Sequence, residues 1–219
     1  MQKVLIAGAS RGIGFEMARL LAERGDNVTI TCRRPPANLE HLEVRCIEGV
    51  DVTDDQAVAQ LADTLEGTTL DMLIHNAGIL TKETLDDLDF DRIRSQFEVN
   101  ALAPLRVVSA LRRNLVAGSK VGIVTSRMGS IEDNGSGGMY GYRMSKAAAN
   151  MAGKTLSRDL ADSGVPVMLL HPGLVATQMT GGNGIDPADA ARGLISQMDS
   201  LTMDTSGTFH HAEGYTLPW

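Results

Sequence analysis

The chain has 219 residues, of which 43% are hydrophobic and 21% charged, a balance typical of globular proteins and not of disordered ones. The formal net charge is -7, which argues against general affinity for nucleic acid or for anionic membranes. This length suits one well-filled hydrophobic core, so we expect a single domain that spans residues 1–219.

Short apolar runs alternate with longer segments of helical periodicity along the chain. The expected strands are Lys3–Ala7, Asn27–Thr31, Val44–Glu48, Asp71–His75, Val121–Thr125 and Val165–His171, with a last short strand near Gly207–His211. The expected helices lie at about 12–24, 54–65, 89–117, 140–162 and 187–200. Continuous Val/Ile/Leu strands between helices indicate parallel strands that are covered on both faces. The pattern predicts an α/β fold: a single-domain, doubly wound parallel sheet of the Rossmann type, with helices on both faces.

The first expected strand runs into a glycine-rich loop that opens the first helix. Its glycines are spaced G-x-x-x-G-x-G, which differs from G-x-G-x-x-G but serves the same physical purposes. Glycine permits a tight turn and a close approach of backbone to a pyrophosphate, and the start of the helix offers free N–H groups to an anion. An ordinary glycine turn is the alternative. The loop predicts cofactor contacts from Gly8, Ser10, Arg11, Gly12, Ile13 and Gly14.

The residues after the second expected strand indicate which dinucleotide binds. NAD enzymes carry an Asp or Glu there to bind the ribose 2′-hydroxyl, whereas this chain has Cys32, Arg33 and Arg34. A carboxylate would repel a 2′-phosphate, and guanidinium groups bind one through charge-assisted hydrogen bonds. Together with Arg11 in the nearby glycine loop, these arginines predict NADP(H). The alternative is that they are solvated surface charges.

Tyr142 and Lys146 lie four residues apart at the start of the expected helix at 140–162. Residues i and i+4 share a helix face, so the tyrosine hydroxyl and the lysine ammonium can converge. An unperturbed tyrosine has a pKa of about 10, and a nearby cation lowers that value by stabilising the phenolate. We expect Tyr142 to act as general acid or base toward a substrate oxygen. Tyr140 has no lysine four residues on and is not expected to take this role.

Two further polar residues stand at informative places. Ser126 follows the fifth expected strand, at the edge of the sheet where ligands bind, and its hydroxyl is placed to hydrogen-bond a substrate oxygen. A local contact with backbone is the alternative. Asn100 interrupts a helical segment, although asparagine is a poor helix former. It predicts a kink or a water-binding role, or else an exposed neutral residue.

Cysteine and histidine usage gives no sign of a metal site. Cys32 and Cys46 do not form a CxxC pair, and the five histidines show no spacing typical of metal ligands. Such sparse cysteine usage favours a reducing, cytoplasmic setting. The chain begins with a strand-like run and not with the features of a signal peptide, and no run reaches the ~18 apolar residues that span a bilayer. We therefore expect neither a bound metal nor a membrane partner.

Taken together, these residues resemble the short-chain dehydrogenase/reductase family over nearly the whole chain. The motifs that carry the resemblance are GASRGIG at 8–14, DVTD at 51–54, NAG at 76–78, Asn100, SRMG at 126–129, YRMSK at 142–146 and HPGLVAT at 171–177. The tail SGTFHHAEGYTLPW and the DNGSGG insert look most like the C-factor/sniffer-like carbonyl reductase branch.

The resemblance implies a role for each matched residue. Tyr142 would donate a proton to the carbonyl, Lys146 would lower its pKa and bind the nicotinamide ribose, and Ser126 would orient the carbonyl oxygen. Asn100 would hold a water that links Lys146 to solvent. The remaining implied cofactor contacts are Asp51 and Val52 at the adenine, Asn76, Ala77 and Gly78 along the cleft, and Pro172, Gly173, Val175 and Thr177 beside the nicotinamide.

The sequence also departs from the pattern of the family. Ala7 stands where Thr is frequent, and His75 stands where Asn is common. Ser126 and Tyr142 are farther apart than usual, so residues 132–139 are expected to form an added lip at the substrate pocket. The chain is short after Thr177, and the glycine-rich segment 178–186 predicts a mobile loop and not a packed helical lid. Met179 is expected to be the main apolar contact of that loop with substrate.

These observations predict an NADP(H)-dependent oxidoreductase that reduces a small carbonyl, or oxidises the matching alcohol, by hydride transfer. The alternative, from another class, is an NADP(H)-binding signalling or sensor protein with the same fold. The expected partner is a small molecule and not nucleic acid, and a homo-oligomer, either dimer or tetramer, is compatible with the sequence. The identity and stereochemistry of the substrate stay open.

Overall fold

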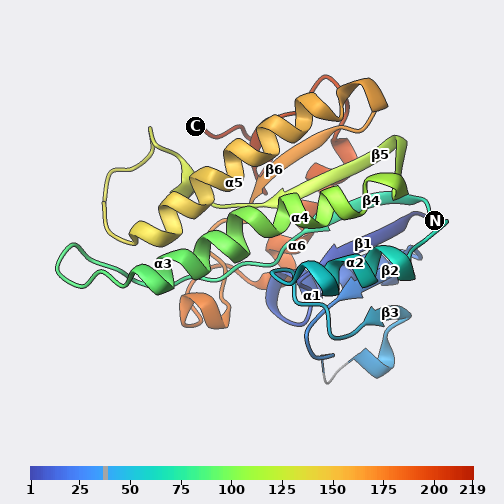
Figure 1. Ribbon diagram of the computed structural model, residues 1–219, viewed down its shortest axis with the longest axis horizontal. Helices are drawn as coiled ribbons and strands as arrows, with labels where there is room; N and C mark the ends of the chain where they lie inside the picture. Colours follow the sequence, from blue (N-terminus) through green and yellow to red (C-terminus); the bar gives the residue numbers. More distant parts are fainter. Residues whose placement is uncertain (37–38) are drawn as a thin grey trace.

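The computed structural model describes residues 1–36 and 39–219, and its centre is a seven-stranded parallel sheet (Figure 1). The strand order is β3-β2-β1-β4-β5-β6-β7. The chain starts in the middle of the sheet, builds outward to β3 and then returns to β4, so the direction of winding reverses between β1 and β4. Ligands of open α/β sheets bind at such a reversal. The strands are β1 (Lys3–Ala7), β2 (Asn27–Thr31), β3 (Val44–Ile47), β4 (Leu70–His75), β5 (Leu115–Val124), β6 (Val167–His171) and β7 (Thr208–His211).

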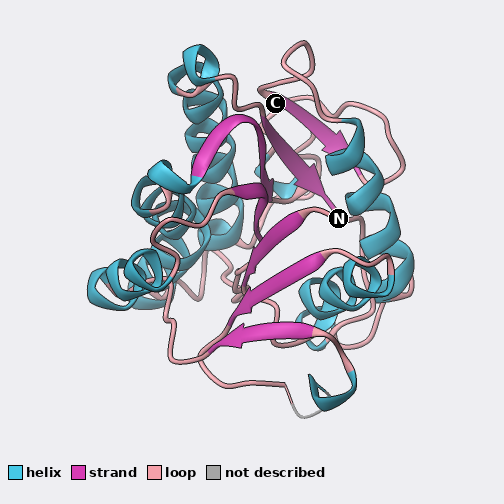
Figure 2. Ribbon diagram, turned by 90° about the vertical axis from the view of Figure 1, so that its right-hand side faces the viewer, coloured by secondary structure: helices cyan, strands magenta, loops and turns pink. Residues whose placement is uncertain are grey.

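Helices cover both faces of the sheet, as the sequence predicts (Figure 2). On one face, α1 (Gly12–Glu23) packs against α6 (Pro187–Ser200). The other face carries α2 (Asp55–Thr64), α4 (Ala103–Ala110) and α5 (Tyr140–Asp159), with α3 (Phe90–Phe97) packed against α5. Within the described residues, no helix is long and apolar enough to cross a membrane. Short 3₁₀ turns lie at Leu39–His41, Arg112–Asn114, Arg127–Gly129, Ala161–Ser163 and Gln178–Thr180, and a π-helical segment, Glu98–Leu102, joins α3 to α4.

The alternation of side chains along each strand divides the core into two layers. Ile6 and Ile74 point toward α1 and α6, where Leu194 is fully buried. Leu5 and Leu73 point the other way, toward α2 and α4. Successive residues of a strand face opposite sides of the sheet, and here both sides are covered. This explains why the strands read as continuous apolar runs.

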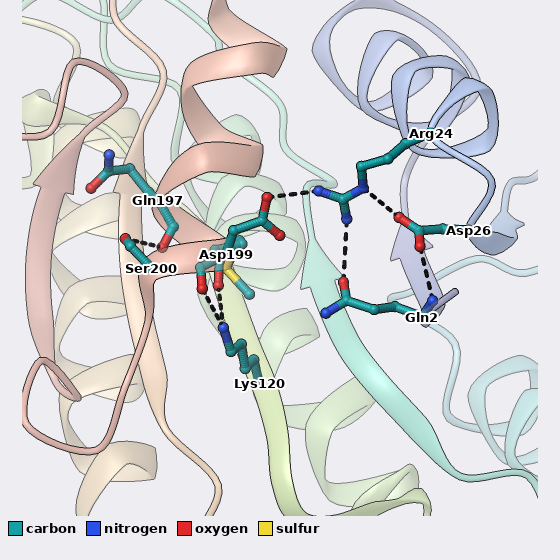
Figure 3. Close-up of polar contacts among 8 residues, drawn as sticks. Gln2, Arg24, Asp26, Lys120, Gln197, Asp199 and Ser200 are labelled. Carbon is teal, nitrogen blue, oxygen red and sulfur yellow. Dashed lines mark hydrogen bonds and ion pairs between the residues drawn. The ribbon is translucent and has the colours of Figure 1, made fainter.

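A polar cluster ties the sheet to α6 at the amino ends of the strands, away from the edge where ligands bind (Figure 3). Arg24 bridges Asp26 and Asp199, with a guanidinium nitrogen 2.6 Å from a carboxylate oxygen of each. Asp26 also accepts the backbone N–H of Gln2 at 2.8 Å. Lys120 donates to two carbonyls at the end of α6, at 3.0 and 2.6 Å, where a cation is favoured by the helix dipole. These contacts hold together the framework on which the opposite edge is built.

The predicted boundaries differ from the structure mainly between residues 89 and 125. One continuous helix over 89–117 is wrong, because α4 ends at Ala110 and β5 already begins at Leu115. The physical reason is Asn114, whose Nδ2 donates to two carbonyls of the turn after α2, at 2.7 and 2.8 Å. This contact draws the chain away from a helical path and toward the sheet. Elsewhere the observed elements end within a few residues of the predicted ones.

Candidate active site

A cleft of about 1020 Å³ opens at the carboxyl ends of the strands, around the reversal of strand order. Its walls come from the segments that follow β1, β2, β3, β4, β5 and β6, together with residues of α3, the π-helical segment and α5. The predicted site residues that line it are Gly8, Ser10, Arg11, Gly12, Ile13, Arg33, Asp51, Val52, Asn76, Ala77, Gly78, Tyr142, Lys146, Pro172 and Thr177. The predicted residues outside this lining are Gly14, Arg34, Asn100, Ser126, Gly173 and Val175.

At Gly8 and Gly14 of the glycine loop, neighbouring atoms lie too close to admit a side chain. Gly8 has a φ of +82°, and a Cβ there would lie 2.6 Å from the Cα of Ala77. A Cβ on Gly14 would lie 2.5 Å from Asn76 Nδ2, which donates to the carbonyl of Gly8 at 2.7 Å. The loop after β1 is therefore held tightly against the loop after β4. Since Arg11 provides no side-chain cap for α1, the first N–H groups of that helix are available beside the cleft, as an anion site requires.

The three arginines that predict the cofactor take different positions. Arg33 is exposed and lines the cleft. Arg34 is also exposed but lies outside the lining. Arg11 lines the cleft, and its Nη1 donates to Oε1 of Gln178 at 2.5 Å, which links the glycine loop to the segment after β6. Arg33 is therefore the arginine after β2 that faces the cleft.

Asp51 is fixed in its ionised form on the wall that it shares with Val52. Its Oδ1 accepts the backbone N–H and the hydroxyl of Thr53, at 2.9 and 2.7 Å. These two hydrogen bonds, together with the charges of Arg33 and Arg106, hold the pKa of Asp51 below its usual value. The carboxylate is therefore an acceptor with a defined position beside Arg33.

Tyr142 and Lys146 lie one turn apart on α5 and are both buried at the wall of the cleft, with 8% and 4% of their surface exposed. Lys146 Nζ lies 5.8 Å from the centre of the Tyr142 ring. It donates to the carbonyl of Val124, the last residue of β5, at 3.0 Å. Burial of this ammonium lowers the pKa of Lys146 to about 8. The structure brings the two side chains together, as the helical spacing predicts.

The surroundings of Tyr142 raise the pKa of its phenol, which is opposite to the direction that the sequence predicts. Burial disfavours the phenolate, and a hydrogen bond with Ser126 opposes this effect only in part. Ser126 also accepts the N–H of Met128 at 3.1 Å, so its hydroxyl serves both the phenol and the local backbone. At neutral pH the Tyr142 phenol is protonated and can donate.

Asn100 lies in the π-helical segment Glu98–Leu102, which is the kink that its position in the sequence predicts. It is 2% exposed, so the alternative of an exposed neutral residue is wrong. Its Nδ2 donates to the carbonyl of Ile79 and to the hydroxyl of Ser145, both at 2.9 Å. Its Oδ1 accepts the N–H of Ile79 at 2.9 Å. Asn100 therefore clamps the loop after β4 to α5, one residue before Lys146.

The segment after β6 forms the last wall of the cleft. Residues 178–186 begin as a single 3₁₀ turn and not as a longer helix, because Thr177 and Thr180 cap each other and Gly181 ends the turn with a φ of +64°. Val175, predicted as a cofactor contact, is 3% exposed and pairs with Ile185 in a β-bridge. Met179 lines the cleft and is 43% exposed. The predicted lip, residues 132–139, is mostly exposed and lies outside the cleft lining.

Three buried polar residues near the site have no signal in the sequence. His75, Glu83 and Gln96 are each at most 1% exposed. Burial and the charge of Lys146 lower the pKa of His75, at the end of β4, to about 3. Glu83 and Gln96 hydrogen-bond each other where α3 meets the start of α5. Their positions depend on contacts between separate elements, which no local pattern reveals.

Cys32, directly after β2, lies beside Cys46 on β3, and the two do not form a disulfide. Their Sγ atoms are 3.0 Å apart, and both thiols are free. Burial raises the pKa of Cys32 to about 12, so this thiol is neutral. Among the described residues, no group of His, Cys, Asp and Glu side chains is arranged to hold a metal ion.

Comparison with known proteins gives one consistent family. A family model described as short chain dehydrogenase matches residues 2–187. The chain is 46% identical, over 226 residues and 100% of both chains, to the 1-hydroxy-2-glutathionyl-2-methyl-3-butene dehydrogenase of Rhodococcus sp. (strain AD45). It is 45% identical over 154 residues, which are 68% of this chain and 93% of the relative, to the C-signal of Myxococcus xanthus.

Solved structures show the same likeness. The carbonyl reductase Sniffer of D. melanogaster aligns with a TM-score of 0.91 and 28% identity, over 100% of both chains. The NADPH-bound carbonyl reductase from chicken fatty liver aligns with a TM-score of 0.89 and 27% identity, over 100% of this chain and 99% of that one. These proteins agree with the family and the branch that the motifs predict.

Proposed function

This chain belongs to the short-chain dehydrogenase family, and we propose that residues 1–219 form one catalytic domain that uses NADP(H) to reduce a small carbonyl compound or to oxidise the matching alcohol. The observation that carries the proposal is the buried pair Tyr142 and Lys146 at the wall of the cleft, with the hydroxyl of Ser126 placed to lower the pKa of the phenol in part. The alternative function, a cofactor-binding sensor, leaves this arrangement without a purpose.

The cleft fits a phosphorylated dinucleotide. The glycine loop has no room for side chains at Gly8 and Gly14, and it leaves the start of α1 open to a pyrophosphate. Arg33 lines the cleft at the position where NAD enzymes carry an acid. A guanidinium there binds a 2′-phosphate and has no equivalent partner in NADH. These features support NADP(H) as the cofactor.

The residues of the site divide the chemistry of reduction between them. The bound cofactor would supply a hydride to the carbonyl carbon. Tyr142 donates its proton to the carbonyl oxygen, so the carbonyl gains one hydride and one proton and becomes an alcohol. The raised pKa of Tyr142 keeps that proton on the phenol at neutral pH. Lys146, mostly cationic below its pKa of about 8, stabilises the phenolate that remains, and Ser126 hydrogen-bonds the same substrate oxygen.

Calorimetry with the purified protein tests the choice of cofactor. We expect NADPH to bind at least tenfold more tightly than NADH, which corresponds to about 1.4 kcal/mol, and Arg33→Asp to narrow or reverse this ratio. Arg34→Asp is the matched control, because Arg34 is exposed next to Arg33 but lies outside the cleft lining. Equal affinity of the unsubstituted protein for both cofactors would contradict the choice of NADP(H).

A substrate panel tests the reaction itself. Aldehydes, ketones and quinones are each mixed with the protein and NADPH, and the loss of NADPH absorbance is followed. The oxidative direction is tested with NADP+ and hydroxy thioethers, because the Rhodococcus relative is named for a glutathionyl alcohol. Turnover of at least one of these compounds is expected. A protein that binds NADPH in calorimetry but turns over no member of the panel would favour the sensor instead.

A further inference from the structure

Glu83 is a carboxylate buried in the loop between β4 and α3, with 1% of its surface exposed. Burying a charged group is costly unless its oxygens are hydrogen-bonded, and both oxygens of Glu83 have neutral donors. Oε2 accepts the backbone N–H of Gly141 at 3.2 Å. Oε1 accepts Nε2 of Gln96 at 3.1 Å and the hydroxyl of Thr81. The carboxylate therefore joins its own loop, α3 and the first turn of α5.

The donors around Glu83 are themselves held in place. Gln96, on α3, is fully buried, and its Oε1 accepts the N–H of Thr81 at 3.1 Å, so both ends of its amide are occupied. Gly141 has no room for a side chain, because a Cβ would lie 2.2 Å from Gln96 Nε2 and 3.1 Å from the Cα of Ile93. The start of α5 is seated directly on α3, with Glu83 at the junction.

At this end α5 has no cap of its own. Its N-cap residue, Met139, has a φ of +50° and makes no side-chain hydrogen bond to the helix. The N–H of Met139 instead donates to the carbonyl of Glu83 at 2.8 Å. Helices usually satisfy their first N–H groups with a polar N-cap side chain, and a carboxylate near the first turn is favoured by the helix dipole. Glu83 supplies these contacts from the loop between β4 and α3. Its carbonyl accepts the N–H of Met139, and its carboxylate accepts the N–H of Gly141, one residue before Tyr142.

From this geometry we infer that Glu83 is a positioning residue for Tyr142, an inference that rests on the proposed function. Glu83 holds the first turn of α5 so that the Tyr142 hydroxyl meets Ser126 and the substrate oxygen. A shift of about 1 Å at a reacting group can cost about 100-fold in rate. The glycine loop and Arg33 lie on other elements, so they continue to bind NADPH when Glu83 is changed.

The variant Glu83→Gln tests this role because it keeps the size of the side chain but replaces one acceptor oxygen with an amide group that cannot accept. We expect kcat to fall at least about tenfold while the Kd of NADPH stays within about twofold of wild type. The matched control is Asp54→Ala, which removes the cap of α2, where Asp54 Oδ1 accepts the N–H of Gln56 at 2.8 Å. The control should lower the melting temperature but leave kcat unchanged.

A Glu83→Gln enzyme whose kcat falls less than about tenfold, or no more than that of Asp54→Ala, would overturn the inference. If Glu83→Gln does not fold, Thr81→Val decides, because it removes one donor and keeps the carboxylate. It should lower kcat about threefold at an unchanged Kd for NADPH, and an unchanged kcat would again overturn the inference. Absence of turnover in the wild-type protein would instead overturn the proposed function, so the two failures are distinguishable.

Discussion

Replacing Asn100 with alanine should lower the free energy of unfolding by about 2–4 kcal/mol. The substitution removes the two hydrogen bonds to the backbone of Ile79 and the one to the Ser145 hydroxyl. Each buried polar group left without a partner costs about 1–3 kcal/mol. Ile79 lines the cleft, so water can replace part of what its backbone loses, and the buried Ser145 hydroxyl keeps its own hydrogen bond to the carbonyl of Tyr142 at 2.9 Å. The expected loss is therefore smaller than three full penalties.

Urea unfolding followed by circular dichroism measures this loss. The midpoint should fall without a change of slope, since the denatured state is not affected. In a thermal scan, the same loss should lower the melting temperature by about 4–16 °C, at about 2–4 °C per kcal/mol for a chain of this size. A change below about 0.5 kcal/mol in the free energy of unfolding, typical of a surface substitution, would show that Asn100 does not hold the loop after β4 against α5.

Asn114→Ala is the matched control for this variant. Asn114 is also buried, at 6% exposure, and also donates from Nδ2 to two backbone carbonyls, but it lies at the opposite end of the sheet from the cleft. Both variants should be destabilised, whereas only Asn100→Ala should lose turnover, because it releases α5 beside Lys146. Equal turnover of the two folded variants would show that Asn100 serves stability alone.

Two further substitutions probe the buried wall of the cleft. Lys146→Met should abolish turnover yet raise the free energy of unfolding at pH 7, because burial lowers the pKa of the ammonium from 10.5 to about 8 and so penalises its charged form by roughly 3 kcal/mol. The penalty is present below the folded pKa and disappears as pH rises from about 8 to 10.5. Urea titrations of wild type and Lys146→Met across this pH window test the lowered pKa. A difference in stability between the two proteins that stays constant over the window would contradict it. Gly129→Ala should reduce NADPH turnover at least about tenfold, because a Cβ there would lie 2.6 Å from the carbonyl carbon of Lys146 and push α5 away. Gly135→Ala, with open space around the residue, should keep the wild-type turnover. If Gly129→Ala turns over as fast as Gly135→Ala, α5 can accommodate the added methyl group without displacement, and the prediction is wrong.

The sheet and the proximity of Tyr142 to Lys146 could be predicted because their signals are local. A buried parallel strand reads as a continuous apolar run, and the run Lys3–Ala7 is also the observed β1. The pairing of Tyr142 with Lys146 follows from spacing within one helix. The glycine loop likewise follows from its place between a strand and a helix, where Gly8 needs a positive φ.

The rest depends on contacts between elements that are far apart in the sequence. The helix predicted through residue 117 ends early because Asn114 bonds the turn after α2. The pKa of Tyr142 is raised because its phenol is buried, and burial is a property of the assembled fold. Glu83, in an exposed-looking polar segment of the sequence, is buried because Gln96 and Gly141 lie opposite its carboxylate. A single sequence contains no periodicity that reports such partners.

The most direct test of the account is the turnover of Tyr142→Phe. Phenylalanine keeps the buried ring and removes only the hydroxyl, so the proton donor is lost while the wall of the cleft stays intact. With a carbonyl that the wild type reduces, kcat should fall by about 10²–10⁴-fold at a nearly unchanged Kd for NADPH. Tyr140→Phe, two residues earlier and 37% exposed, should keep the wild-type rate. A Tyr142→Phe enzyme that retains most of its turnover would contradict the assignment of Tyr142 as the proton donor.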